Sequence, residues 1–288
     1  MLIYIKLLLT AIFWGGTFVA GRSLAQNVGP FSAAFLRFAI ASLFLVFLTW
    51  KAEGRLPGLK NRQILPVLLL GLTGVFCYNL FFLKGLKLIE AGRAAIIIAN
   101  NPVFIALFSA LFFKEKLNWL KIAGILLSVS GAIIVISKGD LLEILQGQLG
   151  LGEFYLFLCV LSWVIFSLLG KAVMVDLSPL SSVTYSSIAG MVLLFPPALS
   201  EGLADCIYYS LSDWWSIFYL GFFGTVLGFV WFYEGINRIG PTRAGLFINF
   251  VPISAILLAF LILGEPLTFS LLIGTILVST GVYLTNRP

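Results

Sequence analysis

Long apolar runs separated by short polar gaps occupy almost the whole chain, and they decide in which solvent it can fold. A helix needs about 20 apolar residues to cross the ~30 Å hydrocarbon layer of a bilayer. We predict ten such runs, with approximate bounds 3–22, 31–50, 64–86, 94–113, 119–137, 152–171, 180–199, 214–234, 244–263 and 269–285. Apolar residues make up 60% of the sequence and charged residues 10%, which is far from the composition of soluble domains. We therefore expect an all-α multi-pass membrane protein with ten transmembrane helices.

The second half of the sequence repeats the first. The stretch Gly92–Leu117 returns as Thr242–Leu267, and each copy has an arginine near its start, a central proline and a glutamate near its end. Matches extend through both halves: Trp14 with Trp163, Gly74 with Gly224, Gly85 with Gly235, Arg93 with Arg243, Pro102 with Pro252, Glu115 with Glu265, Gly124 with Gly274, and Gly131 with Gly281. We expect one five-helix repeat in residues 1–138 and a second in residues 152–288.

The number of helices in each repeat sets the relative orientation of the halves. Five is odd, so the second repeat is expected to enter the membrane from the opposite side, as an inverted copy of the first. Charge agrees, because the loop after the second run is basic and its counterpart after the seventh run is acidic: Lys51, Arg55, Lys60 and Arg62 stand against Glu201, Asp205 and Asp213. Basic loops face the cytoplasm. We expect both termini there, in a cell membrane (the inner one of a Gram-negative source), with Lys84, Lys87 and Arg93 as basic exceptions on the outer side.

Composition excludes several functional classes. The sequence has no histidine, which removes the commonest metal ligand and general base, and its three cysteines show no paired spacing. A net charge of +6 would suit nucleic acid in a soluble protein, but here the basic residues lie between apolar runs, where they orient membrane helices. The sequence contains no phosphate-binding P-loop. We expect no metal, no cofactor, no nucleic-acid partner and no enzymatic activity.

Two prolines occupy matching positions inside the fourth and ninth runs. Proline lacks an N–H and clashes with the carbonyl four residues earlier, so Pro102 and Pro252 are expected to break these helices. A symmetric pair of breaks near the midplane is typical of transporter hinges and binding sites. A simple packing kink is the alternative, because membrane helices tolerate proline.

Asparagines accompany these breaks. Asn100 and Asn101 precede the first proline at mid-depth, where their carboxamides offer donors and acceptors to a polar solute. We predict that both bind substrate, together with Asn249 in the second copy, and Asn79 in the third run is a further candidate. The alternative is that asparagines hold neighbouring helices together.

Ionisable and aromatic residues within the runs supply the remaining candidates. We expect Arg37 either at the interface or in contact with a buried carboxylate. Glu234, near the end of the eighth run, and Arg37 are the candidates for proton coupling, and an interfacial anchor is the alternative role of Glu234. Trp14 and Trp163 match in the repeat and lie near mid-helix, so we expect them to line a cavity, with a place in an interfacial belt as the alternative.

Several matched features carry a family resemblance: Trp14-Gly15, Pro30 followed by Arg37-Phe38, Gly85-Leu86, Pro102, Glu115-Lys116-Leu117, Pro252 and Gly264-Glu265-Pro266-Leu267. With both halves aligned, the chain resembles the EamA family of the drug/metabolite transporter superfamily. The resemblance implies inverted five-helix repeats, alternating access, and a central cavity lined mainly by helices other than the fifth and tenth. Two departures leave the substrate undefined: Ser186 stands opposite Arg37, and the first copy ends Lys-Glu-Lys.

The expected function is secondary transport through a midplane site. Similarity to exporters implies outward movement of small metabolites such as amino acids, with the solute, the bilayer and, where transport is coupled, a proton as partners. An uptake permease or a uniporter for another solute is the first alternative. A non-transporting scaffold is the second, and an enzyme acting on lipid is disfavoured because catalytic groups do not cluster.

Overall fold

The computed structural model describes residues 1–114, 117–139, 150–173 and 177–286, and all regular structure in these ranges is helical. Glu115 and Lys116 lie outside the described residues. The first half contains α1 (Leu2–Asn27), α2 (Pro30–Glu53), α3 (Asn61–Leu70), η1 (Gly71–Cys77), α4 (Tyr78–Leu88), α5 (Ala91–Ile98), α6 (Asn101–Phe113) and α7 (Trp119–Ile136). The second half contains α9 (Leu151–Val173), α10 (Pro179–Glu201), η2 (Leu203–Tyr208), α11 (Leu211–Phe218), η3 (Tyr219–Leu227), α12 (Gly228–Ile239), α13 (Pro241–Gly245), η4 (Leu246–Asn249), α14 (Phe250–Leu258), η5 (Ala259–Leu263) and α15 (Phe269–Thr285).

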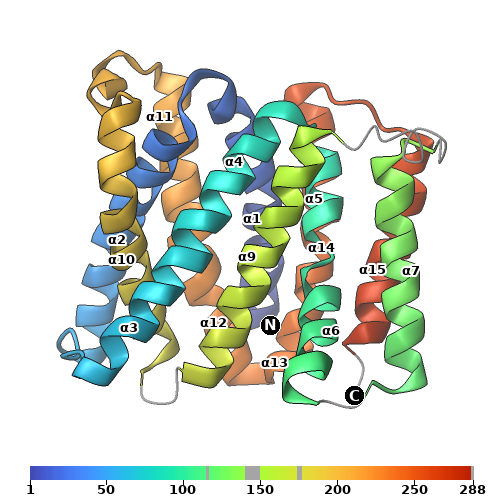
Figure 1. Cartoon of the computed structure of the whole chain (residues 1–288), viewed down its shortest axis with the longest axis horizontal. Coiled ribbons are helices and arrows are strands. Elements are labelled where there is room, and N and C mark those ends of the chain that lie inside the picture. The colour runs from blue at the N-terminus through green and yellow to red at the C-terminus, as the bar shows by residue number, and fades with distance from the viewer. Residues whose placement is uncertain (115–116, 140–149, 174–176, 287–288) are drawn as a thin grey trace.

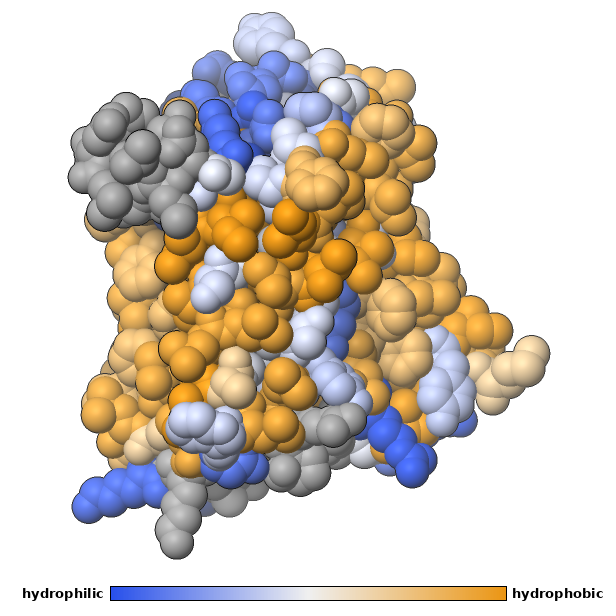
Figure 2. Space-filling model, turned by 90° about the vertical axis from the view of Figure 1, so that its right-hand side faces the viewer, coloured by the Kyte–Doolittle hydropathy of each residue, from blue (hydrophilic) through white to orange (hydrophobic). Residues whose placement is uncertain are grey.

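The elements form one bundle of membrane-spanning length (Figure 1). In the described part of the chain, nine helical stretches are long and apolar enough to cross a membrane, and α15 is a shorter apolar helix of 17 residues. Apolar residues cover the middle of the face in Figure 2, and hydrophilic residues gather toward its upper and lower ends. The predicted all-α membrane fold is thus confirmed.

Glycines join the last helix of each half. A Cβ atom on Gly124 would lie 2.7 Å from the carbonyl oxygen of Gly281, and one on Gly131 would lie 2.9 Å from that of Gly274, so only glycine permits this approach. The start of α7 therefore meets the end of α15, and the two helices run antiparallel next to each other (Figure 1). Because Gly124 matches Gly274 and Gly131 matches Gly281 in the repeat, the two contacts are one contact with the halves exchanged.

A second pair of exchanged contacts joins the halves closer to the centre. Leu7 of α1 packs against Gly235 of α12, and Leu156 of α9 packs against Gly85 of α4; in both, a Cβ on the glycine would lie 2.6 Å from the leucine methyl carbon. Leu7 and Leu156 have the same sequence offset as Trp14 and Trp163. The first helix of each half therefore packs into the other half, and the core lies between them.

The third and eighth spans widen into π-helix at matching positions. Segment η1 begins at Gly71 and segment η3 covers Gly221, the residue that matches it. In η3 the hydroxyl of Thr225 donates to the carbonyl of Leu220 at 3.0 Å, which satisfies a backbone acceptor in the widened turn. π-Helical turns occur frequently at functional sites, because they displace a side chain from its regular α-helical direction.

The fourth and ninth spans are broken ahead of their prolines. Helix α5 ends at Ile98 and α6 starts at Asn101, which places Pro102 in the first turn of the new helix, where its missing N–H has no intrahelical role. In the second half, α13 and the 3₁₀ segment η4 precede α14, whose third residue is Pro252. The first break therefore falls two to three residues before Pro102, and the 3₁₀ segment of the second half lies three to six residues before Pro252.

Candidate solute-binding site

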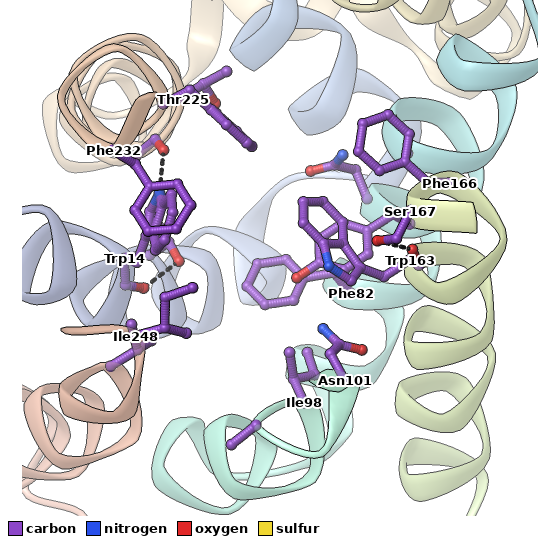
Figure 3. Close-up of a pocket in the computed structure, with 18 of the residues that line it drawn as sticks. Trp14, Phe82, Ile98, Asn101, Trp163, Phe166, Ser167, Thr225, Phe232 and Ile248 are labelled. Atoms are coloured by element: carbon purple, nitrogen blue, oxygen red, sulfur yellow. Dashed lines mark hydrogen bonds between the residues drawn. The ribbon is translucent and has the colours of Figure 1, made fainter. Parts of the chain in front are cut away.

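A cavity of about 440 Å³ lies between the two halves (Figure 3). Residues of α1, α2, η1, α4, α5 and α6 line it from the first half, and residues of α9, α10, η3, α12, η4, α14 and α15 line it from the second. Small-molecule sites typically enclose roughly 300–1,000 Å³. The cavity is therefore large enough for one small metabolite.

Two aromatic groups face each other across the cavity (Figure 3). On one side, Trp14 donates from Nε1 to the carbonyl of Gly224 at 2.9 Å, and its ring centre lies 5.2 Å from that of Phe232. On the other, the ring centre of Trp163 lies 5.1 Å from that of Phe166. Both tryptophans line the cavity, at the matching positions that the sequence singled out.

The structure separates the two adjacent asparagines. Asn100 is 2% exposed, donates from Nδ2 to the carbonyl of Ile96 at 3.0 Å and accepts from the hydroxyl of Ser128 on α7 at 2.7 Å. Asn100 is not among the described residues that line the cavity. Consecutive side chains on a helix point about 100° apart, so Asn100 and Asn101 face different directions. Asn101 lines the cavity, and its buried Oδ1 accepts a hydrogen bond from no described protein group. Asn249 also lines the cavity.

Arg37 lies in the cavity wall and is 8% exposed. Its guanidinium donates to Oδ1 of Asn79 at 2.7 Å and to Oγ1 of Thr225 at 3.2 and 3.3 Å. The sequence predicted either an interfacial position or a carboxylate partner, and neither is observed, because two neutral side chains hold the guanidinium in the interior. Asn79 is thereby the residue that positions Arg37.

Family comparison agrees with this architecture. Residues 1–137 and 150–287 match the EamA-like transporter family. The chain belongs to this family. The cavity of this EamA-like transporter lies between the two matched stretches, and α15 adds Val278, Ser279 and Val282 to its wall, whereas no described residue of α7 lines it.

Proteins similar to this EamA-like transporter match it over nearly its whole length. An "Uncharacterized transporter YyaM" of Bacillus subtilis (strain 168) is 29% identical over 281 residues, which span 97% of this chain and 92% of that protein. A "Probable terminal-alkyne amino-acid exporter" of Streptantibioticus cattleyicolor is 27% identical over 283 residues, spanning 98% of this chain and 92% of the exporter. A crystal structure with 20% identity shares the fold, with a TM-score of 0.65 over 98% of this chain and 97% of its own.

Glu234 lies away from the cavity. Its carboxylate contacts Nζ of Lys6 at 2.6 Å and Nη2 of Arg238 at 3.1 Å, and its side chain is 27% exposed. The neighbouring residue Tyr233 lines the cavity, whereas Glu234 does not. The bond to Lys6 joins α12 of the second half to α1 of the first, whereas the bond to Arg238 lies within α12.

The sequence did not foresee the contact made by the matched glutamate of the second copy. Glu265 accepts from the backbone N–H groups of Ala91 at 2.7 Å and Gly92 at 3.0 Å. A carboxylate satisfies the otherwise unpaired donors at the start of a helix and interacts favourably with its dipole. The loop after η5 thus caps α5 of the other half.

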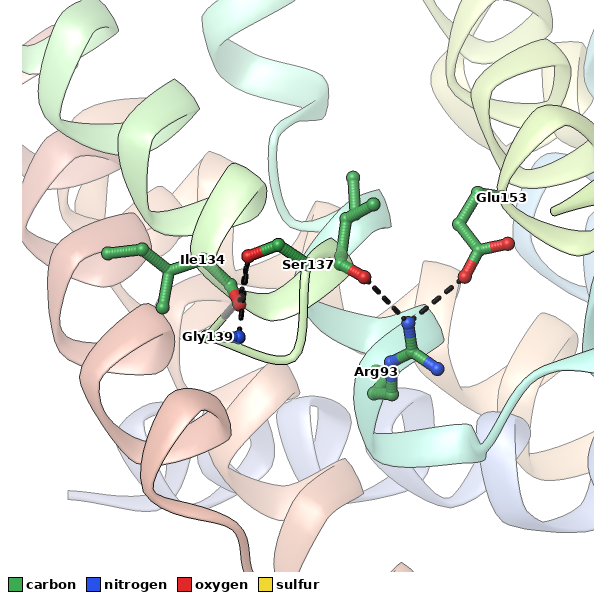
Figure 4. Close-up of polar contacts among 6 residues, drawn as sticks. Arg93, Ile134, Ser137, Gly139 and Glu153 are labelled. Carbon is green, nitrogen blue, oxygen red and sulfur yellow. Dashed lines mark hydrogen bonds and ion pairs between the residues drawn. The ribbon is translucent and has the colours of Figure 1, made fainter. Parts of the chain in front are cut away.

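Arg93, a basic exception to the charge rule, forms an ion pair close to this cap (Figure 4). Its Nη2 lies 3.0 Å from Oε1 of Glu153 on α9 and also donates to the carbonyl of Ile136 at 3.1 Å. Both charged side chains are nearly buried, at 14% and 13% exposure. Arg93 therefore ties the start of α5 to the second half.

Thr225 and Ser279 line the cavity as well, and sequence reasoning missed both. Thr225 lies one residue after Gly224, a matched glycine, and the widened turn of η3 turns its hydroxyl toward Arg37. The matched glycines that precede it, Gly221 and Gly224, were the signal available in the sequence. Ser279 lies on the tenth span, which the family resemblance assigned a minor part in the cavity.

Proposed function

We propose that this protein is a secondary transporter that exports small amphipathic metabolites such as amino acids. The observation that carries the proposal is the cavity between the halves, which combines facing tryptophans with the polar groups of Arg37 and Asn101. An apolar wall with a few convergent polar groups is typical of small-molecule sites. A non-transporting scaffold has no need of such a cavity. The relative described as an amino-acid exporter supports the choice of solute and direction.

Alternating access follows from the relation that we propose for the halves, residues 1–138 and 152–288. Antiparallel packing of the matched helices α7 and α15, together with contacts that recur with the halves exchanged, supports an inverted repeat with a two-fold axis in the membrane plane. The two halves then rock against each other around the cavity. In this mechanism the breaks before Pro102 and Pro252 are the hinges. Both termini lie on the cytoplasmic side of the cell membrane.

Substrate contacts are assigned to the residues that line the cavity. Asn101 and Asn249 offer their carboxamides, and Trp14 and Trp163 offer aromatic faces. We assign Asn100 the role of stabilising the break between α5 and α6, because its Nδ2 and its Oδ1 are both hydrogen-bonded within the protein.

Proton coupling remains a separate proposal for Glu234. Its ion pairs with Lys6 of α1 and Arg238 of α12 favour the alternative role of an interfacial anchor. Replacing Glu234 with glutamine distinguishes the two: coupling predicts that the pH dependence of flux flattens, and an anchor predicts an unchanged pH response with a lower melting temperature.

Counterflow in proteoliposomes tests the function. Liposomes containing the purified protein are loaded with one unlabelled solute from a panel of amino acids, hydroxy acids, sugars and amines, and uptake of the labelled form is measured. We expect counterflow for a subset of amphipathic amino acids. A complete absence of counterflow across the panel would speak against transport, and counterflow of sugars alone would support the alternative permease for another solute.

A further inference from the structure

Arg37 retains hydrogen-bond donors that the protein does not use. A guanidinium has five N–H groups. The bonds from Nη1 to Asn79 and from Nε and Nη2 to Thr225 use three of them. One N–H group remains on each of the two terminal nitrogens. Free guanidinium N–H groups donate strong, charge-assisted hydrogen bonds to carboxylate oxygens.

No described acidic side chain neutralises Arg37. Its partners Asn79 and Thr225 are neutral, and the ring centre of Phe38 lies 5.2 Å from its Cζ. Among the described residues that line the cavity, none is aspartate or glutamate. A charge in the membrane interior is costly unless an opposite charge or water compensates it. An anionic group of a solute in the cavity would provide that compensation.

The guanidinium is fixed in position before any solute binds. Nδ2 of Asn79 donates to the carbonyl of Val75 at 2.8 Å, and the hydroxyl of Thr225 donates to the carbonyl of Leu220 at 3.0 Å. Both acceptors belong to the π-helical segments, Val75 to η1 and Leu220 to η3. The two widened turns therefore clamp Arg37 from opposite halves, and a preformed site loses less entropy on binding.

The rest of the cavity suits a solute with an apolar body and one further donor. Trp14, Trp163 and Phe229 form apolar wall. Oδ1 of Asn101 and Oγ of Ser279 are buried and have no described hydrogen-bond partner. A buried acceptor without a partner is costly, so an N–H or O–H group of the solute would stabilise it.

We propose that Arg37 is the carboxylate-binding group of this cavity and that the transported solute is a monocarboxylate with an apolar body. The inference rests on the transport function proposed above and narrows its substrate class. Amino acids and hydroxy acids share this chemistry, since each adds a donor of the kind that Oδ1 of Asn101 lacks. An amine without a carboxylate brings a second positive charge next to Arg37 and is excluded by repulsion.

Four probes with the same ring test the assignment: phenylalanine, phenyllactate, phenylalaninamide and phenethylamine. Their binding to the purified full-length protein is measured by calorimetry. We expect phenylalanine or phenyllactate to bind at least about tenfold more tightly than phenylalaninamide, and phenethylamine to show no binding. Between the two carboxylates, the tighter one tells whether an amine or a hydroxyl meets Asn101.

Variants then assign the preference to Arg37. Arg37→Gln should remove the tenfold preference, and Arg37→Lys should keep a preference at lower affinity, because lysine is a point charge without the planar fork. Arg238→Gln is the matched control, since it removes the same charge from a side chain that is 66% exposed at the end of α12. It should bind all four probes as the unmodified protein does.

Two results would overturn the assignment: phenylalaninamide bound as tightly as both carboxylates, or a carboxylate preference that persists in Arg37→Gln. Absence of binding by both carboxylates counts against it equally. If Arg37→Gln does not fold, the probe ratios of the unmodified protein and of Arg37→Lys decide. Carboxylate binding without counterflow would support the carboxylate site at Arg37 and contradict transport. Counterflow of amines alone would support transport and contradict the carboxylate site.

Discussion

At the scale of single residues, the roles of the two adjacent asparagines were only partly predictable from the sequence. The helical repeat predicts that Asn100 and Asn101 point in different directions. It does not tell which of them faces the cavity, because that depends on how α5 and α6 rotate against α7 and α9. In the structure, Asn100 accepts a hydrogen bond from Ser128, and Asn101 lines the cavity. The same dependence on packing explains why Arg37, expected either at the interface or beside a carboxylate, lies beside two neutral side chains.

Substituting each asparagine with alanine should separate these roles. Asn100→Ala leaves the hydroxyl of Ser128 without its acceptor, so we expect a loss of about 1–2 kcal/mol in stability with solute affinity unchanged. Asn101→Ala should weaken solute binding about tenfold and leave the melting temperature nearly unchanged. Thermal melting in detergent and the solute concentration for half-maximal counterflow check both. The reverse pattern, with affinity lost only in Asn100→Ala, would refute the assignment.

At the scale of helices, the proline breaks were predictable and the caps were not. A proline disfavours a continuous helix through its own geometry, and its recurrence at matching positions made breaks in the fourth and ninth spans predictable. The cap of α5 depends on Glu265, a residue 174 positions from Ala91 along the chain, and only the folded bundle brings them together. The π-helical turns of η1 and η3 were missed for a similar reason, since their matched glycines also fit ordinary helix packing.

The cap should be visible in hydrogen exchange. Glu265→Ala removes the acceptor for the amides of Ala91 and Gly92, so we expect these amides to exchange about fivefold faster, in line with about 1 kcal/mol for a cap. Glu201→Ala is the matched control, because Glu201 accepts from the backbone N–H of Ser32 on α2 at 2.7 Å. It should speed exchange at Ser32 alone. Unchanged exchange at the start of α5 in Glu265→Ala would show that the cap does not stabilise it.

The hinge role of the prolines is testable with a matched pair. Pro102→Ala restores an N–H that can bond to the carbonyl of Ile98 and straighten the fourth span. We expect counterflow to slow severalfold with a smaller effect on solute affinity, because Pro102 both follows the break and lines the cavity. Pro252→Ala should behave alike if the halves are symmetric. Full counterflow rates in both variants would leave the breaks as packing features.

At the scale of the whole molecule, the duplication was the most informative feature of the sequence. Periodicity and composition were enough for the all-α membrane fold, and the family match supports transport. The contacts of Gly124 with Gly281 and of Gly131 with Gly274 are equivalent when the two halves are exchanged. Matching residues therefore make matching contacts, and each half packs against the other through them. The cavity lies between the two matched stretches, and its polar groups differ between the copies, such as Arg37 opposite Ser186.

In the transport cycle that we propose, the cavity opens to each side of the membrane in turn. A single cysteine at Ser167, a cavity residue of α9, in a chain lacking Cys77, Cys159 and Cys206, reports this through labelling by a membrane-impermeant thiol reagent. Applied to inside-out and right-side-out vesicles separately, the reagent should label the cysteine from both sides, and a transported solute should slow both reactions. Labelling from one side only, or from neither, would contradict alternating access.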